Sequence, residues 1–166
     1  MSKVKNLSKR EASDPKKEYL FANIDIDLQT PAITIPGGSN IPYDNVLLSN
    51  CITLNSSGGA IVSSSGIYNI SFLTHLFQDS NVNLYIFAIA VNGVIQDGTR
   101  SFTSDITQRG ETVAIQHTNT VNLELNAGDI ITIVNISPPV PTSIIIILSG
   151  KTLAESADTN LSIHKI

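Results

Sequence analysis

Short segments rich in Ile, Val and Leu recur from residue 43 to the end of the chain, and they restrict the possible folds more than any other feature. They follow one another at intervals of about 8 to 14 residues, separated by clusters of turn-forming residues, as in a β-sandwich. No segment shows helical periodicity with a cap at both ends. We therefore predict an all-β domain with strands near residues 46–54, 60–62, 66–78, 82–91, 100–103, 112–125, 130–135, 143–148 and 160–166.

Three local patterns refine this prediction. Asn92-Gly93 after an apolar run is typical of a two-residue hairpin, because both residues tolerate positive φ. Before the segment that begins at Ile130, Gly128 suits a tight turn and Asp129 a hydrogen bond to the backbone. The run of residues 144–148 is continuously apolar, which predicts a strand covered on both faces, as at a subunit interface.

The first 18 residues differ in composition from the rest of the chain. Residues 1–18 are polar and aperiodic. They contain six basic and three acidic residues, which gives this segment a net charge of +3. The remainder of the chain contains four basic and eleven acidic residues and has a net charge of −7. We divide the chain into an extended arm and connector, residues 1–22, and one domain, residues 23–166, whose first strand is indicated by alternating Ile and Asp in residues 23–28. The acids within the arm argue against a nucleic-acid partner.

Neither a membrane span nor an export signal is evident. No apolar stretch reaches the ~20 residues that cross a bilayer, and the first residues lack the apolar segment of a secretory signal. We expect a soluble chain without a membrane partner, made without classical export.

Histidines and paired carboxylates are the first candidates for metal or acid–base chemistry. His75, His117 and His164 have no Cys, Asp, Glu or His at metal-site spacing, so structural or interface roles are expected. Asp25 and Asp27 share the solvent face of the expected strand and are expected to be solvated, with a calcium site as the alternative.

Nucleophile and phosphate-binding patterns are equally weak. Ser63–Gly66 lacks the strand-to-helix context of a hydrolase nucleophile, and no glycine pair precedes a helix. The single Cys51 cannot form an intrachain disulfide and is expected to be a small buried residue, with an intermolecular bridge or reactive thiol as the sharper alternative. We expect no enzyme activity, no cofactor and no metal.

Four segments carry a further pattern: Gly66–Phe72 (Gly-x-Tyr-x-Ile-x-Phe), Leu84–Gly93 (ending in Asn-Gly), Leu123–Ile131 (containing Leu-x-Leu-x-x-Gly-Asp) and Asn160–Ile166. In this order they resemble strands of the tumour-necrosis-factor-like and complement-globular-head jelly rolls. The last segment is similar to that of bacterial members, especially the C-terminal domain of the collagen-like exosporium glycoprotein of bacilli. The resemblance covers residues 43–166.

This resemblance implies a two-sheet antiparallel jelly roll that forms a threefold homotrimer and does not catalyse. The trimer interface is expected on the apolar strand faces that carry Tyr68, Phe72, Val113, Ile115, Leu161 and Ile163. The exosporium relatives carry a collagen-like stalk, which this sequence lacks, so the N-terminal arm needs a role. We expect it to connect trimers through the triplet Tyr19, Leu20 and Phe21.

Two functions follow as hypotheses. The first is a structural, self-assembling subunit whose trimers polymerise through the arm into a spore-surface fibre, such as an endospore appendage or an exosporium layer, with an anchoring or tip protein as a further partner. The alternative is a trimeric binding head of the spore-surface or phage-tip type, hence on a spore or a virion surface, that recognises a carbohydrate or a receptor. Its reading loops would be residues 96–98, 105–111 and 137–142.

Overall fold

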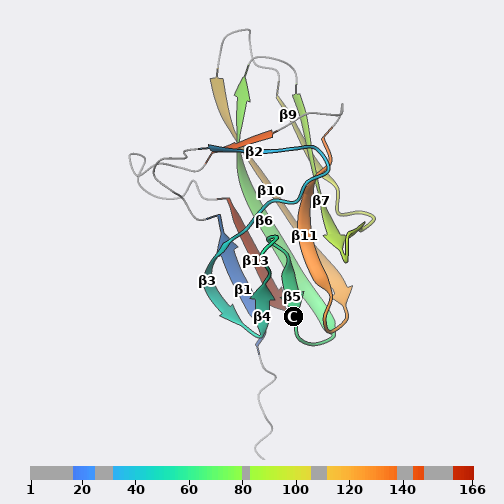
Figure 1. Cartoon of the computed structure of the whole chain (residues 1–166). Coiled ribbons are helices and arrows are strands. Elements are labelled where there is room, and N and C mark those ends of the chain that lie inside the picture. Colours follow the sequence, from blue (N-terminus) through green and yellow to red (C-terminus); the bar gives the residue numbers. More distant parts are fainter. Residues whose placement is uncertain (1–16, 25–31, 80–82, 106–111, 138–143, 148–158) are drawn as a thin grey trace, which may run out of the picture.

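The computed structural model describes residues 17–24, 32–79, 83–105, 112–137, 144–147 and 159–166. Within these ranges the chain forms strands and no helix, which confirms the all-β prediction (Figure 1). The described residues accordingly include no helix that could span a membrane. The strands are β1 (Tyr19–Asn23), β2 (Ala32–Ile35), β3 (Asn45–Asn50), β4 (Ile52–Leu54), β5 (Ala60–Val62), β6 (Gly66–Asp79), β7 (Asn83–Val91), β8 (Val94–Ile95), β9 (Ser101–Asp105), β10 (Thr112–Leu125), β11 (Ile130–Asn135), β12 (Ile144–Ile147) and β13 (Asn160–Lys165).

The strands form two antiparallel sheets. Sheet A has the order β2-β12-β6-β13-β1-β3, and β10 pairs with the other side of β6 along its whole length, from Leu125↔Gly66 to Thr112↔Asp79. Sheet B has the order β4-β5-β11-β7-β8, and β9 also pairs with β7. Most neighbours in the sheets come from distant parts of the sequence, as in a jelly roll, whereas β4-β5 and β7-β8 are consecutive.

The core lies between the two sheets and follows the period of two along each strand. In β6, Tyr68, Ile70 and Phe72 are buried, whereas the intervening Asn69 and Ser71 are partly exposed. Large side chains such as these gain about 1.5–3 kcal/mol each on full burial. Other large side chains that are fully buried are Tyr43, Phe87, Leu20, Ile41, Ile52, Ile89, Ile131 and Ile133.

Strand β1 corrects the expected boundary between arm and domain. Residues 19–23 pair with β13 on one side and β3 on the other, and the side chains of Leu20 and Ala22 are buried. The segment 19–22 is therefore part of the sandwich and not of an arm. Of the strand expected over residues 23–28, only Asn23 falls in β1, and residues 25–28 lie outside the described residues.

Cys51 interrupts the long strand expected over residues 46–54. Its φ is 62°, in the left-handed region that costs a non-glycine residue about 1–2 kcal/mol, and the chain divides there into β3 and β4. The thiol is partly exposed and lies 3.5 Å from Oδ1 of Asn50, so the expectation of a buried apolar Cys51 is wrong.

The two turn predictions are confirmed. Asn92 and Gly93 have φ values of 53° and 79° and join β7 to β8. Gly128 has a φ of 89°, and Oδ2 of Asp129 accepts a hydrogen bond of 2.7 Å from the backbone N–H of Asn126. The same carboxylate accepts a bond of 2.8 Å from the Asn92 amide, so the two turns are tied together.

The apolar run near residue 144 forms β12, which pairs with β2 and with the C-terminal half of β6, at Leu76 and Phe77. Its side chains lie outside the described residues, as do those of Val113 and Ile115 in β10.

Candidate self-association face

Four of the residues expected at a trimer interface belong to the core of the single chain. Tyr68, Phe72, Leu161 and Ile163 are each at most 1% exposed. They face sheet B, so a neighbouring subunit would have to contact the other face of sheet A. This is a correction, and its cause is that alternation groups residues on one face of a strand without saying what covers that face.

The outer face of sheet A is built from the alternate residues of the same strands. Directly paired residues project to the same side of a sheet, and the register joins Leu48, Phe21, Ser162, Ser71 and Thr120 in one row across five strands. Within this row the Thr120 hydroxyl donates a hydrogen bond of 3.2 Å to Oγ of Ser71. The row is apolar at the β3 edge and hydroxyl-bearing in the centre.

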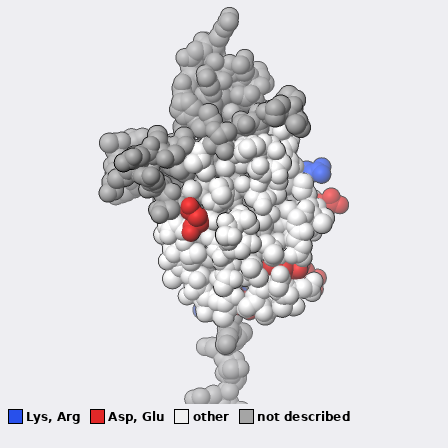
Figure 2. All heavy atoms as spheres, viewed as in Figure 1, with Lys and Arg blue, Asp and Glu red and all other residues white. Residues whose placement is uncertain are grey.

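A second row runs parallel to the first, through Tyr19, His164, Asn69 and Asn122. The Asn69 amide donates a bond of 2.7 Å to Oδ1 of Asn122. Neither row contains Asp, Glu, Lys or Arg. In the view of Figure 2, which does not single out this face, charged side chains are also sparse over the described surface. Uncharged side chains such as those of these two rows lose less solvation free energy than charged ones when another protein covers them.

The β3 edge adds exposed aliphatic surface. Val46, Leu47 and Leu48 are 42%, 51% and 58% exposed, and among the described strands β3 pairs only with β1. Consecutive exposed aliphatic residues on an open edge strand are a place where another chain can dock. Phe21 is also exposed and pairs with Leu48, so the apolar surface continues onto β1.

The expected connector triplet is therefore divided between two environments. Leu20 is buried in the core, whereas Tyr19 and Phe21 lie on the outer face of sheet A. Leu20 has no surface left to insert into a neighbouring trimer.

A buried carboxylate secures the beginning of β1. Oε2 of Glu18 accepts a bond of 2.6 Å from the Tyr68 hydroxyl, Oε1 accepts a bond from the Ser64 hydroxyl, and Nζ of Lys165 lies 3.7 Å from Oε1. Burial raises the pKa of Glu18, but the hydrogen bonds of Ser64 and Tyr68 and the charge of Lys165 outweigh it, so the pKa lies below its ordinary value. Burial and the bond to Glu18 raise the pKa of Tyr68 to about 12. These contacts join the side chains of Glu18, Ser64, Tyr68 and Lys165 into one network, whose role is structural.

His117 is likewise structural. Its ring stacks on Phe72 at a centroid distance of 5.9 Å and lies 5.0 Å from the Phe87 ring, and Nε2 shares a hydrogen bond of 2.8 Å with the Ser101 hydroxyl. Burial lowers the pKa of His117, so the neutral ring is favoured. It fills the core between the two sheets.

In the part of the chain that the structure describes, no three His, Cys, Asp or Glu side chains gather as metal ligands. His164 lies exposed on sheet A. The side chain of His75 and the residues Asp25 and Asp27 fall outside the described residues, as do most of the expected reading loops, 106–111 and 138–142.

Comparison with known proteins agrees with this architecture. No protein-family model and no curated protein matches the sequence. Among solved structures, Eiger TNF from S. frugiperda superposes with a TM-score of 0.68 at 9% identity, covering 92% of this chain and 94% of that one. Murine APRIL superposes with a TM-score of 0.60 at 16% identity, covering 91% of this chain and 100% of that one. The fold is therefore a two-sheet jelly-roll sandwich similar to that of these two structures, as the sequence motifs implied.

Proposed function

We propose that this chain is the subunit of a homotrimeric, non-catalytic head that assembles through the outer face of sheet A. The observation that carries the proposal is the charge-free character of the two rows on that face, together with the exposed aliphatic edge of β3. Obligate interfaces have a composition close to that of a domain core cut in half, with few charges. The threefold arrangement is our inference from the resemblance in sequence, and the shared fold supports it.

We further propose that this head has a structural role, in which the trimers join into a fibre or layer on a spore surface. It is supported by the likeness of residues 160–166 to bacterial spore-surface members and by the contrast between the basic residues 1–18 and the acidic remainder of the chain. Because 19–22 belong to the sandwich, the joining segment is reduced to the residues before β1. The acidic body of a neighbouring trimer would attract this segment over short distances, more strongly at low salt.

A charge placed at the centre of the face tests the trimer. The variant Ser162→Arg, in which the charge would be buried without a partner at the interface, should convert trimer to monomer or dimer while leaving the far-UV circular dichroism unchanged. Thr53→Arg is the matched control, because Thr53 is exposed on β4 of sheet B. Native mass spectrometry at micromolar concentration gives the masses. A soluble wild-type monomer, or a Ser162→Arg trimer as stable as wild type, would contradict the proposal.

Deleting residues 1–16 tests the fibre separately. This truncation spares β1 and Glu18, so we expect intact trimers that no longer form long assemblies in negative-stain electron microscopy. If the truncated protein forms fibres of normal length, the segment is not the connector. If the intact protein forms only discrete trimers, the binding-head function is favoured instead.

A further inference from the structure

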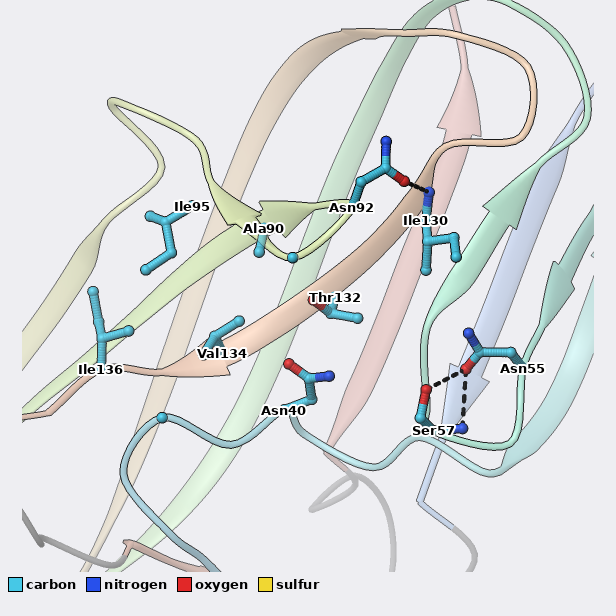
Figure 3. Close-up of a pocket in the computed structure, with 12 residues that line it drawn as sticks. Asn40, Asn55, Ser57, Ala90, Asn92, Ile95, Ile130, Thr132, Val134 and Ile136 are labelled. Atoms are coloured by element: carbon cyan, nitrogen blue, oxygen red, sulfur yellow. Dashed lines mark hydrogen bonds between the residues drawn. The ribbon is translucent and has the colours of Figure 1, made fainter.

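A pocket of about 410 Å³ lies on the outer side of sheet B, away from the proposed self-association face (Figure 3). Its floor exists because a small residue stands between larger ones: Ala90 of β7 pairs with Ile95 on one side and Thr132 of β11 on the other. Ile130 and Val134 extend the floor along β11. A volume of this size falls in the range of small-molecule sites.

The wall opposite β7 is made by the segment that precedes β3. Its backbone runs beside β11, where the Ile41 N–H donates to the Ile133 carbonyl at 2.8 Å and the Asn135 N–H donates to the Ser39 carbonyl at 3.0 Å. Asn40 lies between these bonds and pairs with Val134, so its side chain projects to the same outer side as Val134, into the pocket (Figure 3).

Two polar groups of the pocket have no partner within the described part of the chain. Thr132 is only 7% exposed, yet its hydroxyl makes no hydrogen bond there, and the same holds for the Asn40 amide. Asn40 is partly exposed, and both groups line the pocket, so each is a candidate to bond a ligand there. Asn92 differs, because its side chain already bonds Asp129 and the Ile130 N–H and so shapes the rim.

The lining selects the chemistry of the ligand. It contains no Asp, Glu, Lys, Arg or His, so nothing in it neutralises an ionic ligand. It combines a free amide and a free hydroxyl with branched aliphatic side chains, which suits a molecule with several hydroxyl groups and one C–H face.

We propose that this pocket binds a neutral saccharide, one pyranose unit of which would hydrogen-bond Asn40 and Thr132 and pack its C–H face on Ile95 and Val134. The site is formed by one chain and lies on the sheet that the proposed trimer leaves uncovered, so it stands independently of the trimer. Both a free sugar and the terminal unit of a glycan present this chemistry, and a methyl glycoside imitates the second.

The experiment is a titration of the ¹⁵N-labelled full-length protein with glucose, galactose and N-acetylglucosamine, each as the free sugar and as its methyl glycosides, up to tens of millimolar. We expect saturable amide shifts at Asn40, Thr132 and their neighbours for at least one of these probes. Preference for the methyl glycoside over the free sugar would indicate a glycan-linked source, and the reverse preference a free sugar. Absence of saturable shifts at the pocket with every probe, or shifts confined to other surfaces, would overturn the proposal.

Two variants assign the contacts. Asn40→Ala and Thr132→Val should each weaken binding by about three- to tenfold, the effect of one neutral hydrogen bond. Neither should lower the melting temperature, because neither group bonds the protein. Thr53→Val makes the same chemical change as Thr132→Val outside the pocket and should bind like wild type. Unchanged affinity in both pocket variants would overturn the assignment, whereas a Ser162→Arg monomer that still binds the sugar would separate this site from the trimer.

Discussion

Leu20 offers the sharpest test of where the domain begins, because replacing it by Ala removes a side chain that is 1% exposed. The register places it in a core-facing row with Ile163, Ile70 and Val121. A buried Leu→Ala substitution leaves a cavity and costs about 3–5 kcal/mol. For a chain of this length that corresponds to a fall in melting temperature of roughly 6–20 °C.

The matched control is Leu48→Ala on the neighbouring strand β3. Leu48 is 58% exposed on the outer face, so the same change should cost at most about 1 kcal/mol of domain stability. It should instead weaken self-association, because it removes part of the apolar edge. The two substitutions therefore separate core from interface with identical chemistry.

Urea unfolding followed by far-UV circular dichroism measures the difference, since the chain has no Trp to report fluorescence. The titration is run at two protein concentrations, because the midpoint of an oligomer depends on concentration. If Leu20→Ala and Leu48→Ala lose equal stability, or if Leu20→Ala loses less than about 1 kcal/mol, then β1 is not part of the core and residues 19–22 return to the arm.

Three further predictions concern backbone and pH. Gly58→Ala should destabilise the folded protein by more than about 2 kcal/mol, because φ is 77° and a Cβ would lie 2.6 Å from a backbone nitrogen. Gly93→Ala, with a φ of 79° but open space around the Cβ, should cost about 1–2 kcal/mol. Equal losses of stability in thermal melts would refute the steric argument. Cys51→Gly should raise stability by up to about 1 kcal/mol over Cys51→Ala, because only glycine relieves a φ of 62° without strain; a lower melting temperature for Cys51→Gly would contradict this. The free energy of unfolding should fall in two stages on acidification. The lowered pKa of His117 gives a first loss of stability, which begins as the pH drops below the ordinary histidine pKa of about 6.5. The lowered pKa of Glu18 gives a second loss below the ordinary carboxyl range. His117→Asn should remove the first stage and Glu18→Gln the second in urea midpoints measured against pH, and an unchanged profile in either variant would show that its group is not coupled to folding.

The sequence alone determined the fold class and the positions of most strands along the chain. Strands β5, β10 and β11 have the predicted bounds, and the Asn92-Gly93 and Gly128-Asp129 turns have the predicted conformations. These features depend on a few adjacent residues: alternation sets the two faces of a strand, and a small set of side chains tolerates positive φ. The motif resemblance added the jelly-roll topology, which the solved structures bear out.

Only the tertiary structure decided what covers each face. Leu20 follows a charged segment without clear alternation, and its place in a sheet depends on β13, which lies at the other end of the chain. Alternation grouped Tyr68 with Phe72 correctly but left open whether sheet B or a second subunit buries them, because both solutions satisfy the same pattern. The pocket was hidden for the same reason: Asn40 and Thr132 are distant in sequence, and their polar groups become a site only when long-range pairing brings them to one side of a sheet.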